Sequence, residues 1–138
     1  MDTTIIHEKL ESLRHCLERI RQKRPSTAQA LRDDLDAQDI VSVNLTRAVQ
    51  LCVDIASHVL ADTDQPPPAT MGQSFERLAD AGLITEALAG RMLAAVGFRN
   101  IATHSYREID WDIVHVIATD NLSDFEDFAR AVLRRGNS

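Results

Sequence analysis

A short segment in the last third of the chain, Gly97 to Asp110, gathers polar side chains of unlike chemistry where the helical pattern breaks. Within it, Arg99 supplies a permanent cation, and His104 is the residue type that gains and loses a proton near neutral pH. Such a pair is suited to holding a phosphate group while a proton moves. Tyr106 adds a phenol two residues further on, and we expect its ring to be exposed. The sequence therefore predicts chemistry in this segment.

The spacing of Arg99 and His104 limits how the two side chains can cooperate. On a regular helix, five residues correspond to a rotation of roughly 500°, so the side chains would point about 140° apart. They can share a site only if the helix ends between them or if a second chain completes the site. Asp110 is typical of a helix N-cap, which predicts a short connection over 105–109. His104 and Tyr106 would then project from the turn.

The residue types point to phosphodiester cleavage. The planar fork of Arg99 matches two phosphate oxygens and stabilises the charge that builds on them during attack. His104 can take a proton from a ribose 2′-hydroxyl or give one to the departing 5′-oxygen, which is worth roughly 10² to 10⁴ in rate. Without a carboxylate cluster, the predicted reaction is metal-independent RNA cleavage that leaves a 2′,3′-cyclic phosphate. We expect no cofactor and no metal site, and DNA, which lacks the nucleophile, should not be cut.

One histidine cannot easily serve as both acid and base in a single turnover. A two-fold dimer that brings two copies of the motif together would supply both groups. Asn100, next to Arg99, has two interpretations of equal weight: its amide orients Arg99 or His104, or its side chain ends the helix.

This segment resembles the Arg-x4-His signature of the HEPN ribonuclease superfamily, in the His-x-Tyr form typical of HepT toxins. The resemblance extends to the chain length, the polar second helix over 44–54, the stretch 75–84 and the motif over 97–106. It implies a HEPN-like homodimer with its catalytic cleft at the interface. It also implies the toxin of a type VII toxin–antitoxin module, silenced by a nucleotidyltransferase antitoxin of the MntA type.

For Tyr106, the resemblance implies a regulatory role. In HepT-like proteins the tyrosine of His-x-Tyr accepts AMP groups from the antitoxin. A bulky anionic adduct there would occupy the RNA path and pair with Arg99, which would turn the enzyme off. The alternative is a tyrosine that covers apolar surface with its hydroxyl in water.

A polar stripe at intervals of three and four follows the predicted second long helix, from Asn44 through Arg47 to Asp54 and His58. Such a stripe is often only the solvated face of a helix. In the resembling family this helix packs beside the catalytic turn, so Asp54 or Asn44 would orient motif residues, with Asp54 as the natural partner for Arg99.

Apolar residues recur at helical intervals along most of the chain, and there is no strand-like alternation and no glycine-rich phosphate loop. We therefore predict an all-α, antiparallel, up-and-down bundle of four main helices plus short ones. In chain order, the predicted elements are a helix between Thr4 and Pro25, a short helix capped by Ser26 or Thr27 and reaching Leu35, an acidic turn from Asp33 to Asp39, a long helix from Val41 to Val59, a proline-rich loop from Asp62 to Thr70, a short helix from Ser74 to near Gly82, a helix from Thr85 to Phe98, and a last helix from Asp110 to Leu133.

Length and composition fit one domain over residues 1–138. Cys16 and Cys52 fall at apolar helical positions without metal-ligand spacing, so we expect buried free thiols. The N-terminus lacks the pattern of a signal peptide, and no apolar run approaches the ~20 residues of a membrane span. We expect a cytoplasmic protein that does not enter a membrane.

The net charge of −6 argues against indiscriminate nucleic-acid binding. The acidity is concentrated in residues 25–80, which hold three Lys/Arg against nine Asp/Glu. Arg91, Arg99 and Arg107 bracket the motif, so a local positive pocket is compatible with an acidic protein. For Arg91 alone, the simpler interpretation is a solvated surface charge.

The leading hypothesis is a HepT-type endoribonuclease toxin. The alternative is a non-catalytic helical adaptor that binds nucleotide or a nucleotidyltransferase partner through the same cleft, which the negative charge favours modestly. A third hypothesis is a structural bundle in which the motif is accidental.

Overall fold

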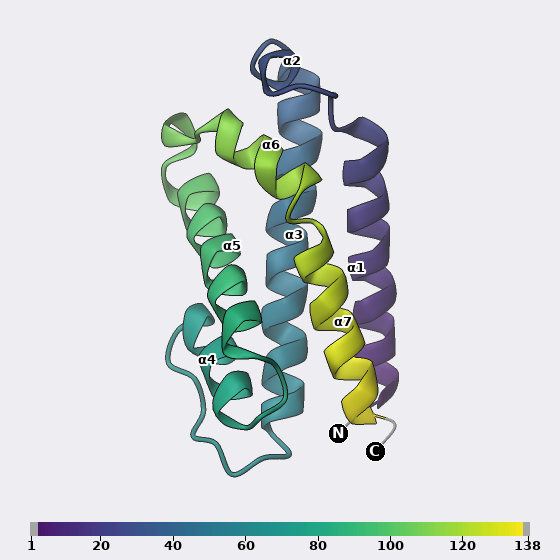
Figure 1. Ribbon diagram of the computed structural model, residues 1–138, viewed down its shortest axis with the longest axis vertical. Coiled ribbons are helices and arrows are strands. Elements are labelled where there is room, and N and C mark those ends of the chain that lie inside the picture. The colour runs from purple at the N-terminus through teal and green to yellow at the C-terminus, as the bar shows by residue number, and fades with distance from the viewer. Residues whose placement is uncertain (1–2, 137–138) are drawn as a thin grey trace.

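The computed structural model describes residues 3–136, which form seven α-helices and one 3-10 turn with no strand among them (Figure 1). The all-α prediction is confirmed. The elements are α1 (Thr3–Lys23), α2 (Ala28–Arg32), α3 (Leu35–Leu60), α4 (Met71–Asp80), α5 (Glu86–His104), η1 (Tyr106–Glu108), α6 (Trp111–Thr119) and α7 (Ser123–Gly136). The long helices α1, α3, α5 and α7 alternate in direction, so the up-and-down arrangement is confirmed too.

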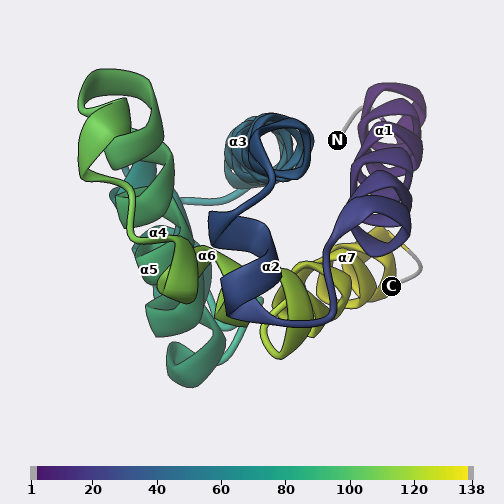
Figure 2. The same cartoon turned by 90° about the horizontal axis from the view of Figure 1, so that it is seen from above.

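The central element is α3, which contacts α1, α4, α5, α6 and α7. Seen from above, it lies between α1 on one side and α5 on the other (Figure 2). By length and composition α3 could cross a membrane, which differs from the expectation that no segment approaches a span. However, 56% of its apolar window is buried against the other helices, as in the core helix of a bundle. Its apolar residues are therefore accounted for by the core.

The acidic stretch predicted as a turn belongs instead to the start of α3. Asp34 is the N-cap, and its carboxylate accepts a hydrogen bond from the backbone N–H of Ala37 at 3.0 Å. Asp36 lies in the first helical turn, where negative charge interacts favourably with the helix dipole. As a result Leu35 starts α3 rather than ending the preceding short helix, and Asp39 is a helical residue.

The single last helix of the prediction is wrong: α6 and α7 are separate. The carbonyl oxygen of Val116 accepts hydrogen bonds from the N–H groups of Asp120, at 2.8 Å, and Asn121, at 3.1 Å, which closes α6. Asp and Asn are weak helix formers because their side chains compete for backbone hydrogen bonds. Leu122, 2% exposed, then anchors the joint in the core before α7 begins.

Other boundaries follow the predicted signals. Thr27 and Thr85 cap α2 and α5 by accepting hydrogen bonds from backbone N–H groups at 3.1 and 3.0 Å. Gly82, with φ of 74°, closes the turn after α4, a conformation that glycine adopts without strain. Cys16 and Cys52 are buried free thiols, as expected.

One continuous hydrophobic core joins all the α-helices of the described residues. Within it, the rings of Phe75 on α4 and Phe128 on α7 make an edge-to-face pair with centroids 5.7 Å apart. Both are fully buried. The helices of this pair, α4 and α7, each contact both α3 and α5. The C-terminal end of α5 lies with η1 and α6 at the α2 end of the bundle (Figure 1).

Candidate active site

The motif helix does not end between Arg99 and His104, so that sequence-based alternative is wrong. Helix α5 continues to His104, and the N–H of Ser105 still bonds to the carbonyl of Ile101 at 2.8 Å. Residues 100–103 contain neither glycine nor proline to interrupt it. Only at Ser105, with φ of −146°, does the backbone leave the helix. The two side chains therefore start about 140° apart on one regular helix.

Arg99 starts on the core side of α5, on the face that carries the buried Met92 and Val96. Its Nε is buried and has no hydrogen-bond partner. One terminal nitrogen, Nη1, donates to Oδ1 of Asn100 at 3.3 Å. Asn100 lies about 100° around the helix, between the directions of Arg99 and His104. The hydrogen bond therefore draws the guanidinium from the core side toward the histidine.

This contact bears on the two interpretations of Asn100. Its side chain contacts Arg99, and the helix continues for four residues beyond it to His104. The interpretation as a helix-ending side chain is wrong, and the contact with Arg99 agrees with the orienting interpretation, which stays a prediction.

His104 is the last residue of α5 and is exposed. Within residues 3–136, no hydrogen bond or ion pair holds its imidazole. The ring is free to exchange a proton with a bound substrate. Within one chain, the motif therefore supplies a cation, Arg99, and a proton carrier, His104, with no hydrogen bond between them.

Tyr106 lies in η1, and 45% of its surface is exposed, as expected. The edge of its ring packs on Trp111, with centroids 6.0 Å apart and planes at 69°. Its hydroxyl donates to Oδ1 of Asp39 on α3 at 3.0 Å. Partial burial, followed by the hydrogen bond and charge of Asp39, raises the pKa of the Tyr106 phenol, while a hydrogen bond from Ser42 opposes the shift. The phenol is thus accessible, protonated and held in one place.

Two apolar side chains flank these polar groups and remain exposed. Val43, one turn after Asp39 on α3, is 46% exposed, and Ile101, one turn before His104 on α5, is 42% exposed. A face that alternates exposed apolar and unpaired polar side chains is suited to contact with another molecule.

The expected support from Asp54 and Asn44 is not found. Asp54 accepts from Gln50 at 3.0 Å and pairs with Lys9 of α1 at 3.5 Å. Asp54 lies fifteen residues beyond Asp39, or about 22 Å along α3, so it is far from the turn that carries Tyr106. The predicted pairing of Asp54 with Arg99 is therefore wrong.

Asn44 is buried, and its amide nitrogen donates to the carbonyl of Ile40 in its own helix at 2.8 Å. Among the described residues, no hydrogen bond joins Asn44 to the motif, and its amide bonds within α3.

Of the three arginines that bracket the motif in sequence, Arg91 does not add its charge there. Arg91 donates to Asp124 of α7 at 2.8 Å, so its charge is neutralised away from the motif. Arg107, in η1, is exposed. In the part of the chain that the structure describes, no three His, Cys, Asp or Glu side chains gather to hold a metal ion.

Residues 13–132 match the family model described as Ribonuclease HepT-like. This chain belongs to the HepT-like ribonuclease family. The matched span contains α3, the whole of α5 and the turn with Tyr106, which are the elements that build the site.

Relatives of this HepT-like protein agree in sequence and in fold. A protein of Shewanella oneidensis named mRNA nuclease HepT is 37% identical over 124 residues, which cover 90% of this chain and 92% of the relative. A toxin–antitoxin structure with AMP-PNP contains a chain with a TM-score of 0.89 and 34% identity, covering 95% of this chain and 98% of that one. A tri-AMPylated Shewanella oneidensis HEPN toxin in complex with MNT antitoxin gives a TM-score of 0.88 at 35% identity, with 94% and 97% covered.

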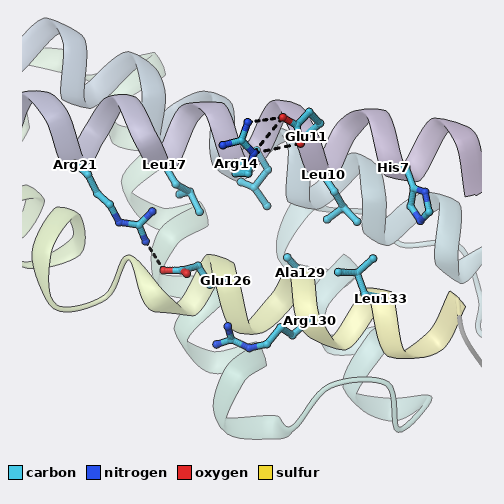
Figure 3. Close-up of a pocket in the computed structure, with 11 residues that line it drawn as sticks. His7, Leu10, Glu11, Arg14, Leu17, Arg21, Glu126, Ala129, Arg130 and Leu133 are labelled. Atoms are coloured by element: carbon cyan, nitrogen blue, oxygen red, sulfur yellow. Dashed lines mark hydrogen bonds and ion pairs between the residues drawn. The ribbon is translucent and has the colours of Figure 1, made fainter.

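An apolar groove of about 500 Å³ in this HepT-like chain lies elsewhere, between α1 and α7 (Figure 3). Leu10, Leu17 and Leu133 line it, and Arg21 forms an ion pair with Glu126 across it. No residue of the motif takes part. The groove is therefore separate from the HepT-like site.

Sequence reasoning missed the residues that hold the tyrosine. The sequence pattern places Asp39 in a predicted turn and Ser42 and Trp111 near the starts of two predicted helices, which gives no sign of a contact with Tyr106. A signal did exist. The polar stripe of α3 passes through Gln50, between Arg47 and Asp54, and Asp39 lies eleven residues before Gln50, three helical turns with nearly the same facing. Recognising it required the correct start of α3.

Proposed function

We propose that this HepT-like protein is a cytoplasmic toxin that cleaves RNA without a metal ion. The observation that carries the proposal is the Arg99 guanidinium, which is drawn by Asn100 toward an unpaired His104 while its own Nε lacks a partner. A phosphodiester would give this cation the anionic partner it lacks. The relative named mRNA nuclease HepT favours messenger RNA as the substrate.

In the proposed reaction, the 2′-hydroxyl attacks the adjacent phosphorus. One bond forms between the 2′-oxygen and phosphorus, the bond from phosphorus to the 5′-oxygen breaks, and a 2′,3′-cyclic phosphate remains. A histidine takes the 2′-proton, and a histidinium gives a proton to the 5′-oxygen. Arg99 stabilises the charge on the phosphate oxygens between these steps.

The acid and the base are supplied by two chains. A single chain has one His104, and on an unbroken helix it starts about 140° from Arg99. A two-fold dimer through the face that carries Val43 and Ile101 would cover both exposed apolar side chains and bring two motifs together. We therefore propose a homodimer with the cleft at its interface.

Control of the toxin occurs at Tyr106. The toxin of a solved relative is tri-AMPylated and bound to MNT antitoxin. In this chain, the phenol is exposed and lies on the turn that directly follows His104. An AMP group attached there would add negative charge beside Arg99 and block access of RNA to the cleft. We propose that a nucleotidyltransferase antitoxin of the MntA type transfers it.

Cleavage assays with purified protein test the nuclease. Wild-type protein should cut RNA in the presence of EDTA, leave 2′,3′-cyclic phosphate ends and spare a deoxy analogue. Arg99→Ala and His104→Ala should each lower the rate by roughly 10² or more. Undiminished cleavage by both folded variants would overturn the assignment.

The proposed AMP transfer to Tyr106 can be tested with labelled nucleotide. Tyr106→Phe should accept no AMP from the antitoxin, because the acceptor oxygen is absent. Incorporation at the wild-type level would place the modification on another residue.

The second candidate is the adaptor, which the net charge of −6 favours. Growth arrest on expression of the chain alone, relieved by His104→Ala, distinguishes the two. Nucleotide binding without growth arrest or cleavage would favour the adaptor.

A further inference from the structure

The proposed RNA cleavage makes no use of the hydrogen bond between Tyr106 and Asp39. The phenol donates to Oδ1 of Asp39 at 3.0 Å, across 67 positions of sequence. Asp39 is itself exposed and forms no ion pair among the described residues. Its carboxylate therefore carries an uncompensated negative charge. Among the described residues, its one side-chain hydrogen bond comes from the hydroxyl of Tyr106, the proposed acceptor of AMP.

The surroundings hold this pair in position while leaving it accessible. Trp111 packs on the edge of the tyrosine ring, and Asp39 is fixed in the second turn of α3. Beside these contacts, 45% of the Tyr106 residue remains exposed. A nucleotide presented by another protein can therefore reach the phenolic oxygen from solvent while Asp39 holds its proton.

We propose that Asp39 is the general base for AMP transfer to Tyr106, so that the toxin supplies part of the machinery that inactivates it. This inference rests on the proposed modification of Tyr106. In the step, the phenolic oxygen attacks the α-phosphorus of ATP and forms an O–P bond. The bond from that phosphorus to the bridging oxygen breaks, pyrophosphate leaves with the electron pair, and the phenolic proton passes to the Asp39 carboxylate and then to water.

A base is required because the attacking group is a neutral phenol. The ordinary pKa of tyrosine is near 10, and burial together with Asp39 raises the pKa of Tyr106 further. Almost no phenolate exists before the reaction, so the proton must leave as the O–P bond forms. Asp39 stands at hydrogen-bond distance from that proton, which is the geometry a general base needs.

The proposed role of Asp39 applies to the first AMP group and not to any later one. After the first transfer, the phenolic oxygen is esterified and has no proton to give. Asp39 therefore acts in the first transfer only, and any later AMP group must be attached through another oxygen.

The test uses the full toxin, purified antitoxin and ATP labelled at the α-phosphate, with intact mass to count AMP groups. Asp39→Asn keeps the shape and removes the base, and Asp36→Asn is the matched control: it removes the same charge from an exposed position one turn earlier in α3. We expect Asp39→Asn to slow the first transfer by roughly 100-fold or more in kcat, with little change in KM. Asp36→Asn should match wild type, Asp39→Glu should restore part of the rate, and later transfers should proceed normally.

If Asp39→Asn receives its first AMP within two-fold of Asp36→Asn, the proton goes to a group of the antitoxin and the inference is wrong. If the loss appears in KM or in antitoxin affinity alone, Asp39 is a docking residue, which also overturns it. If wild-type toxin is not labelled, or is labelled elsewhere than Tyr106, the proposed function fails first.

Discussion

Asn100 accepts a hydrogen bond from the Arg99 guanidinium at 3.3 Å. Without that contact, Arg99 would continue along the core side of α5, where its Nε is already buried. With it, the cationic end is drawn around the helix toward the side of His104. The amide of Asn100 thus reduces the separation of about 140° that a regular helix imposes between the side chains of Arg99 and His104.

Asn100→Ala should weaken RNA cleavage without weakening the fold. The lost hydrogen bond involves a charged donor, so we expect roughly a ten-fold fall in kcat/KM, or about 1.4 kcal/mol. Alanine has a higher helix propensity than asparagine, so the Tm should not fall. Steady-state cleavage assays measure kcat/KM, and thermal unfolding measures the Tm. Full activity would show that Arg99 does not need the hydrogen bond to Asn100 for cleavage.

The ionisation of Tyr106 can be observed directly, because it is the only tyrosine in the chain. Its phenolate absorbance should appear with a midpoint above 10 in the folded protein and near 10 in urea. Because the folded pKa is raised, the related contribution to stability is present below pH 10 and is lost as pH rises through the folded pKa.

Asp39→Asn should lower that midpoint toward the ordinary value, since it removes the anion that disfavours the phenolate. Asp36→Asn serves as the control and should leave it in place. An unshifted midpoint in Asp39→Asn would mean that burial alone sets the pKa of Tyr106.

Phe128→Ala tests the packing that holds α4 against α7. The side chain is fully buried and its ring makes an edge-to-face pair with Phe75. We expect a loss of about 3 to 5 kcal/mol in the free energy of unfolding. Ile113→Ala, at a position 56% exposed, should change it by less than about 1 kcal/mol. Urea denaturation measures the free energy of unfolding of both variants. Equal losses in Phe128→Ala and Ile113→Ala would contradict the assigned core.

The fold was largely predictable from sequence because helical periodicity and capping residues are local signals. Thr85 and Asp110 cap the helices they were expected to cap. The sequence pattern does not predict the helix breaks at Asn121 and before Leu35. The residues around these breaks are compatible with either helix or turn, and long-range packing decides between the two.

The site was predictable only in part, for a related reason. Arg99, His104 and Tyr106 stand close in sequence, so a motif reveals them. Asp39 contacts Tyr106 from a helix 67 positions away, and no local pattern encodes such a pair. Conversely, Asp54 suited Arg99 by chemistry but lies on the α1 side of α3, paired with Lys9.

The dimeric site, with one His104 from each chain, is tested most directly by mixing subunits. Wild-type and His104→Ala chains, differently tagged and co-expressed in equal amounts, should give about a quarter of the wild-type RNA cleavage, because only dimers with two histidines are active. Purified mixed dimers should be nearly inactive. Half the wild-type activity, with mixed dimers half as active as wild type, would show that each chain cleaves RNA with its own histidine and would contradict the account.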